Sequence, residues 1–495
     1  MTLLLLLAVP LAAGLLALGL RSRRALEAVN VVAFALELLL GVRLAATVLA
    51  APEGVVVEWG EFLRADALSA WMVLVVAVVS LASALYAVGY FRRDLAAGAL
   101  GEGRFREYYR LTPFFTAAMV LVVVVNNLGV MWVAVEGTAL SSVLLVALYN
   151  RKTSLEAAWK YIMLGGVGLV LALFGTVLAY ASALGRTGGE VLPSFNWSSL
   201  RDMAAAAELD PALLRLAFIF LFVGYGTKAG LAPMHNWLPD AHSEAPSPTS
   251  AMLSGVSLKV AVYALLRCHM LATAGLQSEV SRHLLLGFGL FSMVLAGPFV
   301  LLQKNLKRML AYSSLEHVGL ICVGFGLNAP LTVLGALLHL GYHALTKPVL
   351  FFAAGNIHQR YHVLDFRRLG SGLCRTMPLT AWLLGVAAVA ISGLPPFGLF
   401  LTELTIVAGA FASHQAWAGV VALIALLVVF CGVLARLAHL VLGPPRGDTG
   451  RETWVAGNVL ALAVPLGALA VFSVWLPAPA WRLLEQAAQL IGQTP

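Results

Sequence analysis

The stretch that decides the fold is "KAGLAPMHNWLPDAHSEAPSPTSAMLSGVSLK", which runs from Lys228 to Lys259. It lies between two strongly apolar segments, "LRLAFIFLFVGYGT" before Lys228 and "VAVYALL" after Lys259. An ammonium group surrounded by apolar sequence is unfavourable unless it has a partner or a task. The two lysines therefore indicate an apolar structure that keeps ionisable groups inside it.

The rest of the chain is equally apolar, with 60% hydrophobic and 11% charged residues among 495. Apolar runs long enough to cross a membrane recur from end to end, and the short alternating segments of a β-barrel are absent. The first run is expected to be a retained helix instead of a signal peptide, because the basic cluster "RSRR" follows it and no basic segment precedes it. We predict an all-α polytopic membrane protein with about 14 transmembrane helices. The expected spans are 2–20, 29–50, 67–90, 111–126, 128–148, 160–182, 212–233, 248–272, 283–303, 307–327, 331–357, 378–410, 416–440 and 453–476.

Basic residues alternate between the connections. One set of connections is rich in lysine and arginine, and the other set, such as "APEGVVVEWGEFLRAD", is richer in acids. By the positive-inside rule, the basic set is cytoplasmic, so both termini are expected on the outer side of a bacterial-type inner membrane. The basic set is Arg21, Arg23, Arg24, Arg92, Arg93, Arg104, Arg106, Arg110, Arg151, Lys152, Lys304, Lys307, Arg360, Arg367, Arg368, Arg375, Arg446 and Arg451.

This distribution also accounts for the net charge of +8 and argues against a nucleic-acid partner, which needs basic residues gathered on one folded face. The four cysteines are far apart in the sequence and form no C-x-x-C motif, so we expect neither a metal site nor a cofactor built on them. The connections are too short for a soluble domain. Function is therefore expected within the membrane or in binding to partner subunits.

Further ionisable residues occur inside apolar segments, where such groups are usually paired and functional. His339, His343 and Lys347 are spaced i, i+4, i+8 and lie along one stripe of a helix, a pattern that suggests a proton relay. Lys347 is followed by Pro348 near a helix end, so it could instead extend to the membrane interface. The other candidates are Glu136, Lys228, Lys259, Glu316, His317 and Glu403.

Two of the expected spans contain clusters of glycine and proline. Gly224, Gly226, Gly230 and Pro233 crowd the seventh span, and the segment 393–398 breaks the twelfth. Irregular backbone at membrane depth persists only where it lines protein or a water-filled cavity. Breaks at corresponding places in two halves indicate an inverted repeat with an ion path at its middle. We predict helices one to three in 1–110, a first five-helix repeat in 111–272, a second in 283–440, and the last helix with the C-terminus in 441–495.

Two patterns that suggest other chemistry are discounted. "GYGTKAG" has the glycines of a nucleotide-binding loop, but it follows no strand and lies in an apolar helix. His235, Asp240, His242 and Glu244 include metal-ligand residue types, but their spacing matches no metal motif carried by a helix. We expect that segment to be a hydrogen-bonded cytoplasmic loop.

The signature "KAGLAPMHNWLPDAHSEAPSPTSAMLSG", the glutamate in "WVAVEGTAL" and the segment "AYSSLEHVG" resemble the antiporter-like subunits of respiratory complex I, Mrp antiporters and group 4 membrane-bound hydrogenases. The resemblance extends from about the third expected span to the thirteenth. "EGTALSSVLLVALYNRKTSLEAAWKY" and "GLPPFGLFLTE" are most similar to the F component of hydrogenase-4 and formate hydrogenlyase-type complexes. That family has two inverted five-helix repeats with broken seventh and twelfth helices.

The resemblance implies a role for each matching residue. Glu136 matches a glutamate that pairs with the lysine at Lys228, Lys259 matches a central lysine, and Glu403 matches the exit group, which is lysine in several relatives. His317, His339 and His343 lie where relatives have the connecting relay, and Glu316 and Lys347 are additional candidates.

These matches predict a proton-translocating subunit that works beside other membrane subunits of a redox complex, with no cofactor or metal of its own. Two alternatives stay open. The first is an Mrp-type cation/proton antiporter subunit, although Na⁺ prefers carboxylate and carbonyl oxygens over lysine and histidine. The second is a structural scaffold in which the buried charges are fixed pairs.

Overall fold

The computed structural model describes residues 1–184, 194–276, 278–444, 452 and 456–492. The expected outward connection around Glu190 and the basic segment with Arg446 and Arg451 lie outside the described residues. The described residues are almost entirely helical, as predicted, apart from an antiparallel pair of short strands, β1 (Val56–Glu58) and β2 (Leu63–Ala65).

The helices follow one another with short connections. Those of the first half are α1 (Thr2–Gly19), α2 (Arg23–Ala50), α3 (Ala67–Ala96), α4 (Glu102–Val124), α5 (Leu128–Val146), α6 (Lys152–Leu184), α7 (Trp197–Ala205), α8 (Pro211–Ala229), α9 (Trp237–Glu244), α10 (Ser247–Met252), the π-helical turn η1 (Leu253–Ser257) and α11 (Leu258–Gly275). Those of the second half are α12 (Val280–Leu302), α13 (Leu306–Leu327), α14 (Pro330–Tyr361), α15 (Phe366–Leu369), α16 (Leu373–Thr376), α17 (Pro378–Ile391), α18 (Gly398–Ala412), α19 (Ala416–Leu442), α20 (Ala456–Val474) and α21 (Ala478–Gly492).

Twelve helical stretches of the described residues are long and apolar enough to cross a membrane, with α10 to α11 taken as one. The more polar helix α14 and the two shorter apolar helices α17 and α18 are not among the twelve, so the total of fourteen spans remains a prediction. Large apolar side chains are exposed on outer helices, among them Leu15 on α1, Val167 on α6 and Leu427 on α19. These exposed side chains are suited to contact with lipid.

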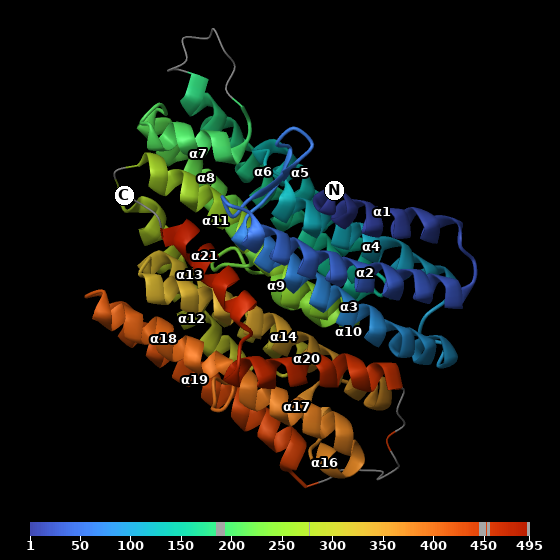
Figure 1. Cartoon of the computed structure of the whole chain (residues 1–495). Coiled ribbons are helices and arrows are strands. Elements are labelled where there is room, and N and C mark those ends of the chain that lie inside the picture. Colours follow the sequence, from blue (N-terminus) through green and yellow to red (C-terminus); the bar gives the residue numbers. More distant parts are fainter. Residues whose placement is uncertain (185–193, 277, 445–451, 453–455, 493–495) are drawn as a thin grey trace.

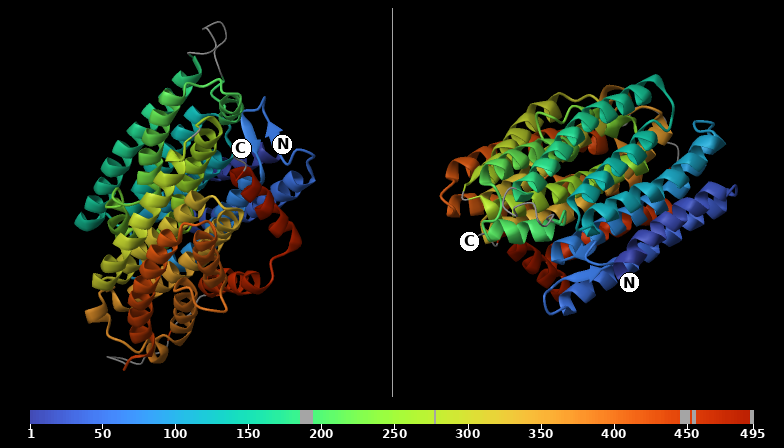
Figure 2. Two further views of the ribbon diagram at one scale, coloured as in Figure 1. Left: turned by 90° about the vertical axis from the view of Figure 1, so that its left-hand side faces the viewer. Right: turned by 90° about the horizontal axis from the view of Figure 1, so that it is seen from above.

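The helices lie side by side in a bundle, and the last helices return to the first ones (Figures 1 and 2). Helices α20 and α21, red in the figures, both pack against α3 and α14. At the centre, α11 is buried at every position from Leu258 to Ala272, and α13 at every position from Met309 to Leu327. Polar residues on these two helices are therefore shielded from lipid.

Glycines allow the closest helix pairs to approach each other. A Cβ atom at Gly224 of α8 would lie 2.5 Å from the Ala172 side chain of α6, and one at Gly289 of α12 would lie 2.7 Å from the Gly319 carbonyl of α13. Small residues at such contacts are typical of helices packed in membranes. The sequence-based interpretation of Gly224 and Gly226 as helix-breaking was wrong, because both residues lie within α8.

The chain does break at the two places where glycine and proline adopt other backbone conformations. Helix α8 ends at Gly230, whose φ of +78° places it in the left-handed region, and α9 begins seven residues later at Trp237. In the second half, α17 ends at Ile391 and α18 begins at Gly398. Gly393, between them, has a φ of +63°, a conformation that favours glycine.

A fully buried ion pair ties α3 to α11. Asp66 caps the N-terminus of α3 by accepting from the Ser69 N–H at 3.0 Å. The Arg267 guanidinium of α11 donates to both Asp66 carboxylate oxygens, at 2.6 and 2.7 Å, and lies 4.2 Å from the Trp197 ring centroid. Burial alone would raise the pKa of Asp66, but the Arg267 guanidinium and the Ser69 N–H hold that pKa below its usual range.

We predict that Asp66→Asn destabilises the protein, because it leaves the Arg267 guanidinium buried without its counter-charge, which costs about 3 kcal/mol or more. Since the folded pKa of Asp66 is lowered, the contribution of the pair is present above the usual carboxyl pKa and is lost only as pH falls through the lowered value. The measurement is the apparent melting temperature of the purified protein. The control is Glu279→Gln, which removes an exposed pair with Arg282 worth about 1 kcal/mol or less. Equal shifts in melting temperature for the two variants would contradict the prediction.

Candidate functional site

The centre of the candidate site is the π-helical turn that precedes Lys259. This turn, η1, joins α10 to α11 in one continuous stretch. π-helical turns interrupt the regular backbone hydrogen bonding of an α-helix and are frequent at functional sites. The Lys259 side chain is fully buried, and its Nζ donates to the Ser254 carbonyl oxygen in the turn. The irregular backbone therefore supplies the acceptor that a buried ammonium needs.

Serines and a backbone carbonyl connect this turn to the second buried lysine. Ser254 Oγ lies 2.7 Å from Ser314 Oγ on α13, and Ser314 donates to the Leu310 carbonyl at 3.0 Å. Lys347 Nζ on α14 donates to the same carbonyl at 2.8 Å and to Ser313 Oγ at 2.9 Å. Because Lys347 is fully buried, the alternative that it extends to the membrane interface is excluded.

The three expected relay histidines come together on α13 and α14, next to α18. His317 Nδ1 lies 3.0 Å from His339 Nε2, and His339 Nδ1 lies 2.8 Å from Thr402 Oγ1 on α18. The ring centroid of His343 lies 4.8 Å from that of His317, and neither His343 ring nitrogen has a hydrogen-bond partner among the described residues. Since a neutral imidazole has one donor and one acceptor nitrogen, the directly bonded pair can pass a proton along its length.

Two glutamates face a cavity beside the histidines. The cavity has a volume of about 280 Å³, and Glu316, His317, Gly393 and Glu403 are among its lining residues. Glu316 is 1% exposed, its Oε2 lies 3.4 Å from His317 Nε2, and its carboxylate oxygens have no hydrogen-bond partner among the described residues. Glu403 packs directly on Gly393 in the second helix break, where a Cβ atom would overlap its carboxylate. The break therefore makes the space that Glu403 occupies.

Three of these groups are close enough to share one ion. The ligand atoms of His317, His339 and Glu403 lie within 4.8 Å of one another. The two histidines instead hydrogen-bond to each other, an arrangement in which one proton lies between two ring nitrogens. This grouping was not foreseen from sequence, because its members come from three separate helices.

Lys228 has a partner that the sequence did not indicate. At the C-terminal end of α8, its side chain is 1% exposed, and its Nζ donates to Tyr161 Oη at 2.5 Å. Tyr161 Oη also lies 2.8 Å from Ser142 Oγ, and the Tyr161 ring stacks on Trp237 at 4.6 Å between centroids. Trp237 Nε1 donates to the Thr227 carbonyl at 2.9 Å, so the residue that follows the first break closes over the lysine.

The expected contact between Glu136 and Lys228 is absent from the ion pairs of the described residues. Glu136 lies half-buried on α5 and is not bonded to Lys228. Ser142, on the same helix as Glu136, connects to Lys228 through Tyr161 instead. The direct pairing expected from the resemblance is therefore not the arrangement in this structure.

The discounted metal-ligand segment is helix α9, so its expectation as a loop was wrong. Asp240 accepts from Lys160 at 3.1 Å and from Arg308, and His242 Nδ1 is paired with the Leu238 carbonyl at 2.8 Å. Helix α9 packs against α6 and α13. These contacts give the segment a structural role at the first break.

Sequence reasoning missed three further buried polar residues. Tyr161 lies among apolar residues and was taken for packing, although a buried phenol needs a partner. Lys307 was assigned to a cytoplasmic connection, but it is 4% exposed and donates to the Ala245 carbonyl at 2.7 Å. Asp94, 6% exposed at the end of α3, accepts from Tyr149 Oη and Gln359 Nε2. The available signal was the position of Lys307 and Asp94 at helix ends, which does not distinguish buried from exposed.

Known proteins share the fold and much of the sequence. Residues 125–429 match the family described as NADH:quinone oxidoreductase/Mrp antiporter, TM, and residues 55–97 match the NADH-ubiquinone oxidoreductase (complex I), chain 5 N-terminus. A hydrogenase-4 component F homolog from Methylacidiphilum infernorum is 40% identical over 390 residues, covering 79% of this chain and 81% of the relative. Hydrogenase-4 component B of Escherichia coli is 33% identical over 444 residues, covering 84% of this chain and 63% of the relative.

Solved structures agree with these matches. A chain of the membrane-bound sulfane sulfur reductase, an archaeal respiratory membrane complex, superposes with a TM-score of 0.86 at 25% identity and covers 99% of this chain and 98% of its own length. A chain of the Mrp complex from Dietzia sp. superposes with a TM-score of 0.82 at 22% identity, covering 100% and 97%. The resemblance drawn from the motifs is thus confirmed, and the chain belongs to the NADH:quinone oxidoreductase/Mrp antiporter transmembrane family.

Proposed function

We propose that this chain is the proton-translocating membrane subunit of a multisubunit redox complex related to hydrogenase-4, formate hydrogenlyase or complex I. The observation that carries the proposal is the buried row of ionisable side chains along α11, α13, α14 and α18, which includes Lys259, Lys347, His317, His339 and Glu403. Ionisable groups buried within a membrane bundle mark ion or proton pathways. Electron transfer in partner subunits would drive the movement of protons along this row.

The row divides into three functional parts. Lys259 and Lys347, bridged by the serines of α10–α13, form the centre, and each holds a proton on its ammonium group. The pair His317–His339 forms the relay, because its two rings and Thr402 are joined by hydrogen bonds. Glu403 is the exit group in the cavity at the second break, and Glu316 is an additional acceptor next to His317.

Lys228 is the proposed gate. In this structure Tyr161 holds its ammonium, so the lysine lies near neither an acid nor water. We assign Glu136 as the acidic partner that Lys228 reaches when it leaves Tyr161, a movement that would alter the electrostatic field at Lys259. Loss of proton uptake in Glu136→Gln supports this assignment, and unchanged uptake in the assembled variant removes it.

An Mrp-type cation/proton antiporter subunit is the alternative, because a chain of that complex shares the fold. The chemistry of the row favours protons. Sodium ions bind carboxylate and carbonyl oxygens, whereas lysine and histidine dominate the row here. We also propose that residues 111–272 and 283–440 form two five-helix repeats of opposite orientation, with the helix breaks at corresponding places.

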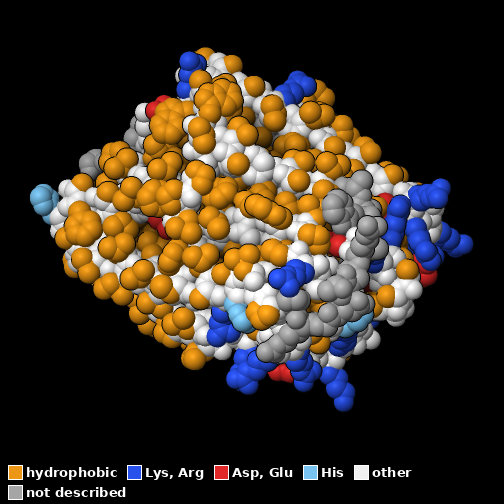
Figure 3. Space-filling model, turned by 90° about the horizontal axis from the view of Figure 1, so that it is seen from below, with side chains coloured by type: hydrophobic (Ala, Val, Ile, Leu, Met, Phe, Trp, Pro, Cys, Tyr) orange, Lys and Arg blue, Asp and Glu red, His pale blue; other side chains and the backbone are white. Residues whose placement is uncertain are grey.

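The proposed orientation places both termini outside a bacterial-type inner membrane. Most lysine and arginine side chains visible in Figure 3 gather toward one end of that face, and hydrophobic side chains cover much of the remainder. The positive-inside rule assigns the basic end to the cytoplasm. Helices α4 and α6 both begin at this end, after Gly101 and Arg151.

Cysteine labelling tests the orientation. Gly103→Cys, at the exposed start of α4, is expected to react with a membrane-impermeant thiol reagent only from the cytoplasmic side. Glu53→Cys, exposed before the β-hairpin, is expected to react only from outside. The measurement is labelling of right-side-out and inverted vesicles. The reverse pattern would overturn both the orientation and the assignment of the termini.

The exit role of Glu403 predicts a graded series. Glu403→Gln keeps the size of the side chain but cannot ionise, so proton uptake is expected to fall about a hundredfold while assembly is preserved. Glu403→Asp and Glu403→Lys are expected to retain part of the activity, because each keeps a group that can bind and release a proton. The measurement is proton uptake into inverted vesicles, driven by the redox reaction of the complex and compared at equal subunit content.

The matched control for this series is Glu156→Gln, which removes a carboxylate that is 63% exposed on α6. Its proton uptake is expected to equal that of the unmodified complex. If Glu403→Gln also pumps like the unmodified complex, Glu403 is not on the path, and Lys347 becomes the exit candidate.

A further inference from the structure

A second set of buried titratable groups lies at the basic end of the bundle, away from the row described above. The ends of α3 and α14 and the turn between α5 and α6 enclose a cavity of about 200 Å³. Asp94, Tyr149 and His358 line it together with Arg93 and Arg151. The cavity is large enough for several water molecules.

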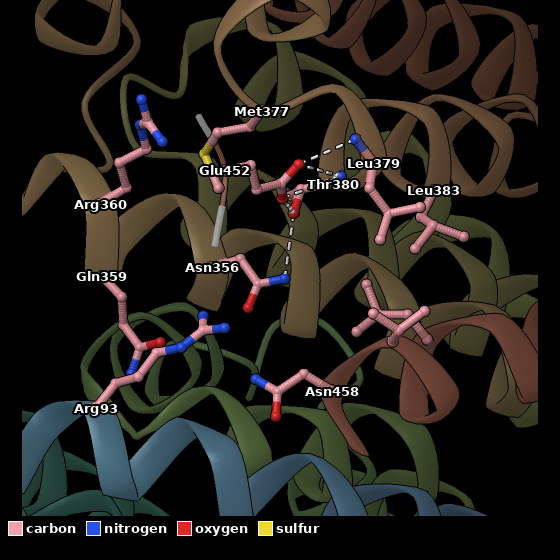
Figure 4. A pocket seen from close by; sticks show the side chains of 12 residues that line it. Arg93, Asn356, Gln359, Arg360, Met377, Leu379, Thr380, Leu383, Glu452 and Asn458 are labelled. Carbon is pink, nitrogen blue, oxygen red and sulfur yellow. Dashed lines mark hydrogen bonds between the residues drawn. The ribbon is translucent and has the colours of Figure 1, made fainter. Parts of the chain in front are cut away.

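The Asp94 carboxylate is held in place but keeps one side toward the cavity. Tyr149 Oη donates to it at 2.5 Å and Gln359 Nε2 donates at 2.8 Å, while the side chain remains 6% exposed. Tyr149 Oη is also 2.8 Å from Tyr90 Oη. Gln359 and Arg93 line a neighbouring polar cavity of about 160 Å³ as well, where their side chains lie next to each other (Figure 4). Two polar cavities thus meet beside Asp94 at the basic end of the bundle.

Lys307 lies behind this cavity at the start of α13. It is 4% exposed, and it interacts electrostatically with Asp94 and His358. Leu310, whose carbonyl accepts from Lys347, follows Lys307 by three residues, and Ser314 follows it by seven. Residues with these spacings share one face of a helix. One face of α13 therefore carries polar groups from the cavity to the central lysines.

We propose that this cavity is the cytoplasmic uptake site for protons, with Asp94 as the first acceptor and Lys307 as the next titratable group inward. The proposal rests on the proposed function and adds its starting point and its selectivity. The Asp94 carboxylate binds a proton from cavity water and releases it toward Lys307. Arg93, Arg151 and Lys307 surround this one carboxylate with positive charge, so a metal cation such as Na⁺ is repelled, whereas a proton can be passed between water molecules.

Blocking the cavity without touching its titratable groups tests the proposal. Ala97 is exposed and lines the cavity, whereas Ala96 is exposed next to it and does not. Each is changed to cysteine in a chain in which Cys374→Ser and Cys431→Ser remove the two cysteines that are not buried. The intact complex in inverted vesicles is then treated with a bulky methanethiosulfonate reagent. Redox-driven proton uptake is measured before treatment, after it, and after a reducing agent removes the label.

We expect labelled Ala97→Cys to lose proton uptake about tenfold and to regain it on reduction, while labelled Ala96→Cys is unaffected. Full uptake in labelled Ala97→Cys, or failure of that cysteine to react from the cytoplasmic side, would overturn the proposal. In a second arm, Asp94→Asn is expected to reduce uptake and Asp94→Glu to retain it, with ²²Na⁺ movement absent throughout. If the cavity variants pump normally while Glu403→Gln does not, the uptake site is wrong and the proposed function stands.

Discussion

A charged group buried in a membrane bundle must find its hydrogen-bond partners inside the protein, because neither lipid nor bulk water can supply them. Lys259 is the strongest case, since its ammonium is fully buried on a helix that is buried on all sides. Its acceptor is the Ser254 carbonyl, which the π-helical turn makes available. The same constraint explains the serines of α13, which connect that turn to Lys347 without placing a second charge between the two lysines.

The two helix breaks satisfy the same requirement by different means. At the first break, Gly230 ends α8, and Trp237 returns to donate to the Thr227 carbonyl while it stacks on Tyr161. This arrangement places a phenol against the Lys228 ammonium. At the second break, Gly393 leaves room for the Glu403 carboxylate beside a cavity. In both cases irregular backbone replaces the water that a charged group would otherwise need.

The membrane class, the helix breaks and the buried lysines could be predicted from sequence, because a lysine or glutamate flanked by apolar residues leaves few other readings. The same reasoning named the histidine stripe and Glu403. It failed where burial depends on distant neighbours. Tyr161 became a partner of Lys228 only through the packing of α6 on α8, and Lys307 became buried only because α9 and α10 cover it.

Other features also lay beyond the sequence pattern. The segment with His242 formed helix α9 because tertiary contacts with α6 and α13 stabilise a helix that is short for isolated stability. The π-helical turn has no local signal in "LSGVS", since one extra backbone residue per turn is favoured only by the packing around it. The expected Glu136–Lys228 contact came from resemblance alone, and such contacts depend on which state of a moving lysine is present.

The central claim is that the buried lysines carry protons and are not fixed structural pairs. Its most direct test is Lys259→Met, which keeps the length of the side chain and removes the ionisable group. The measurement is proton uptake per turnover of the redox reaction in inverted vesicles, together with the subunit content of the purified complex. The result predicted here is a fully assembled complex that turns over without moving protons. An assembled Lys259→Met complex that pumps like the unmodified one would contradict the claim.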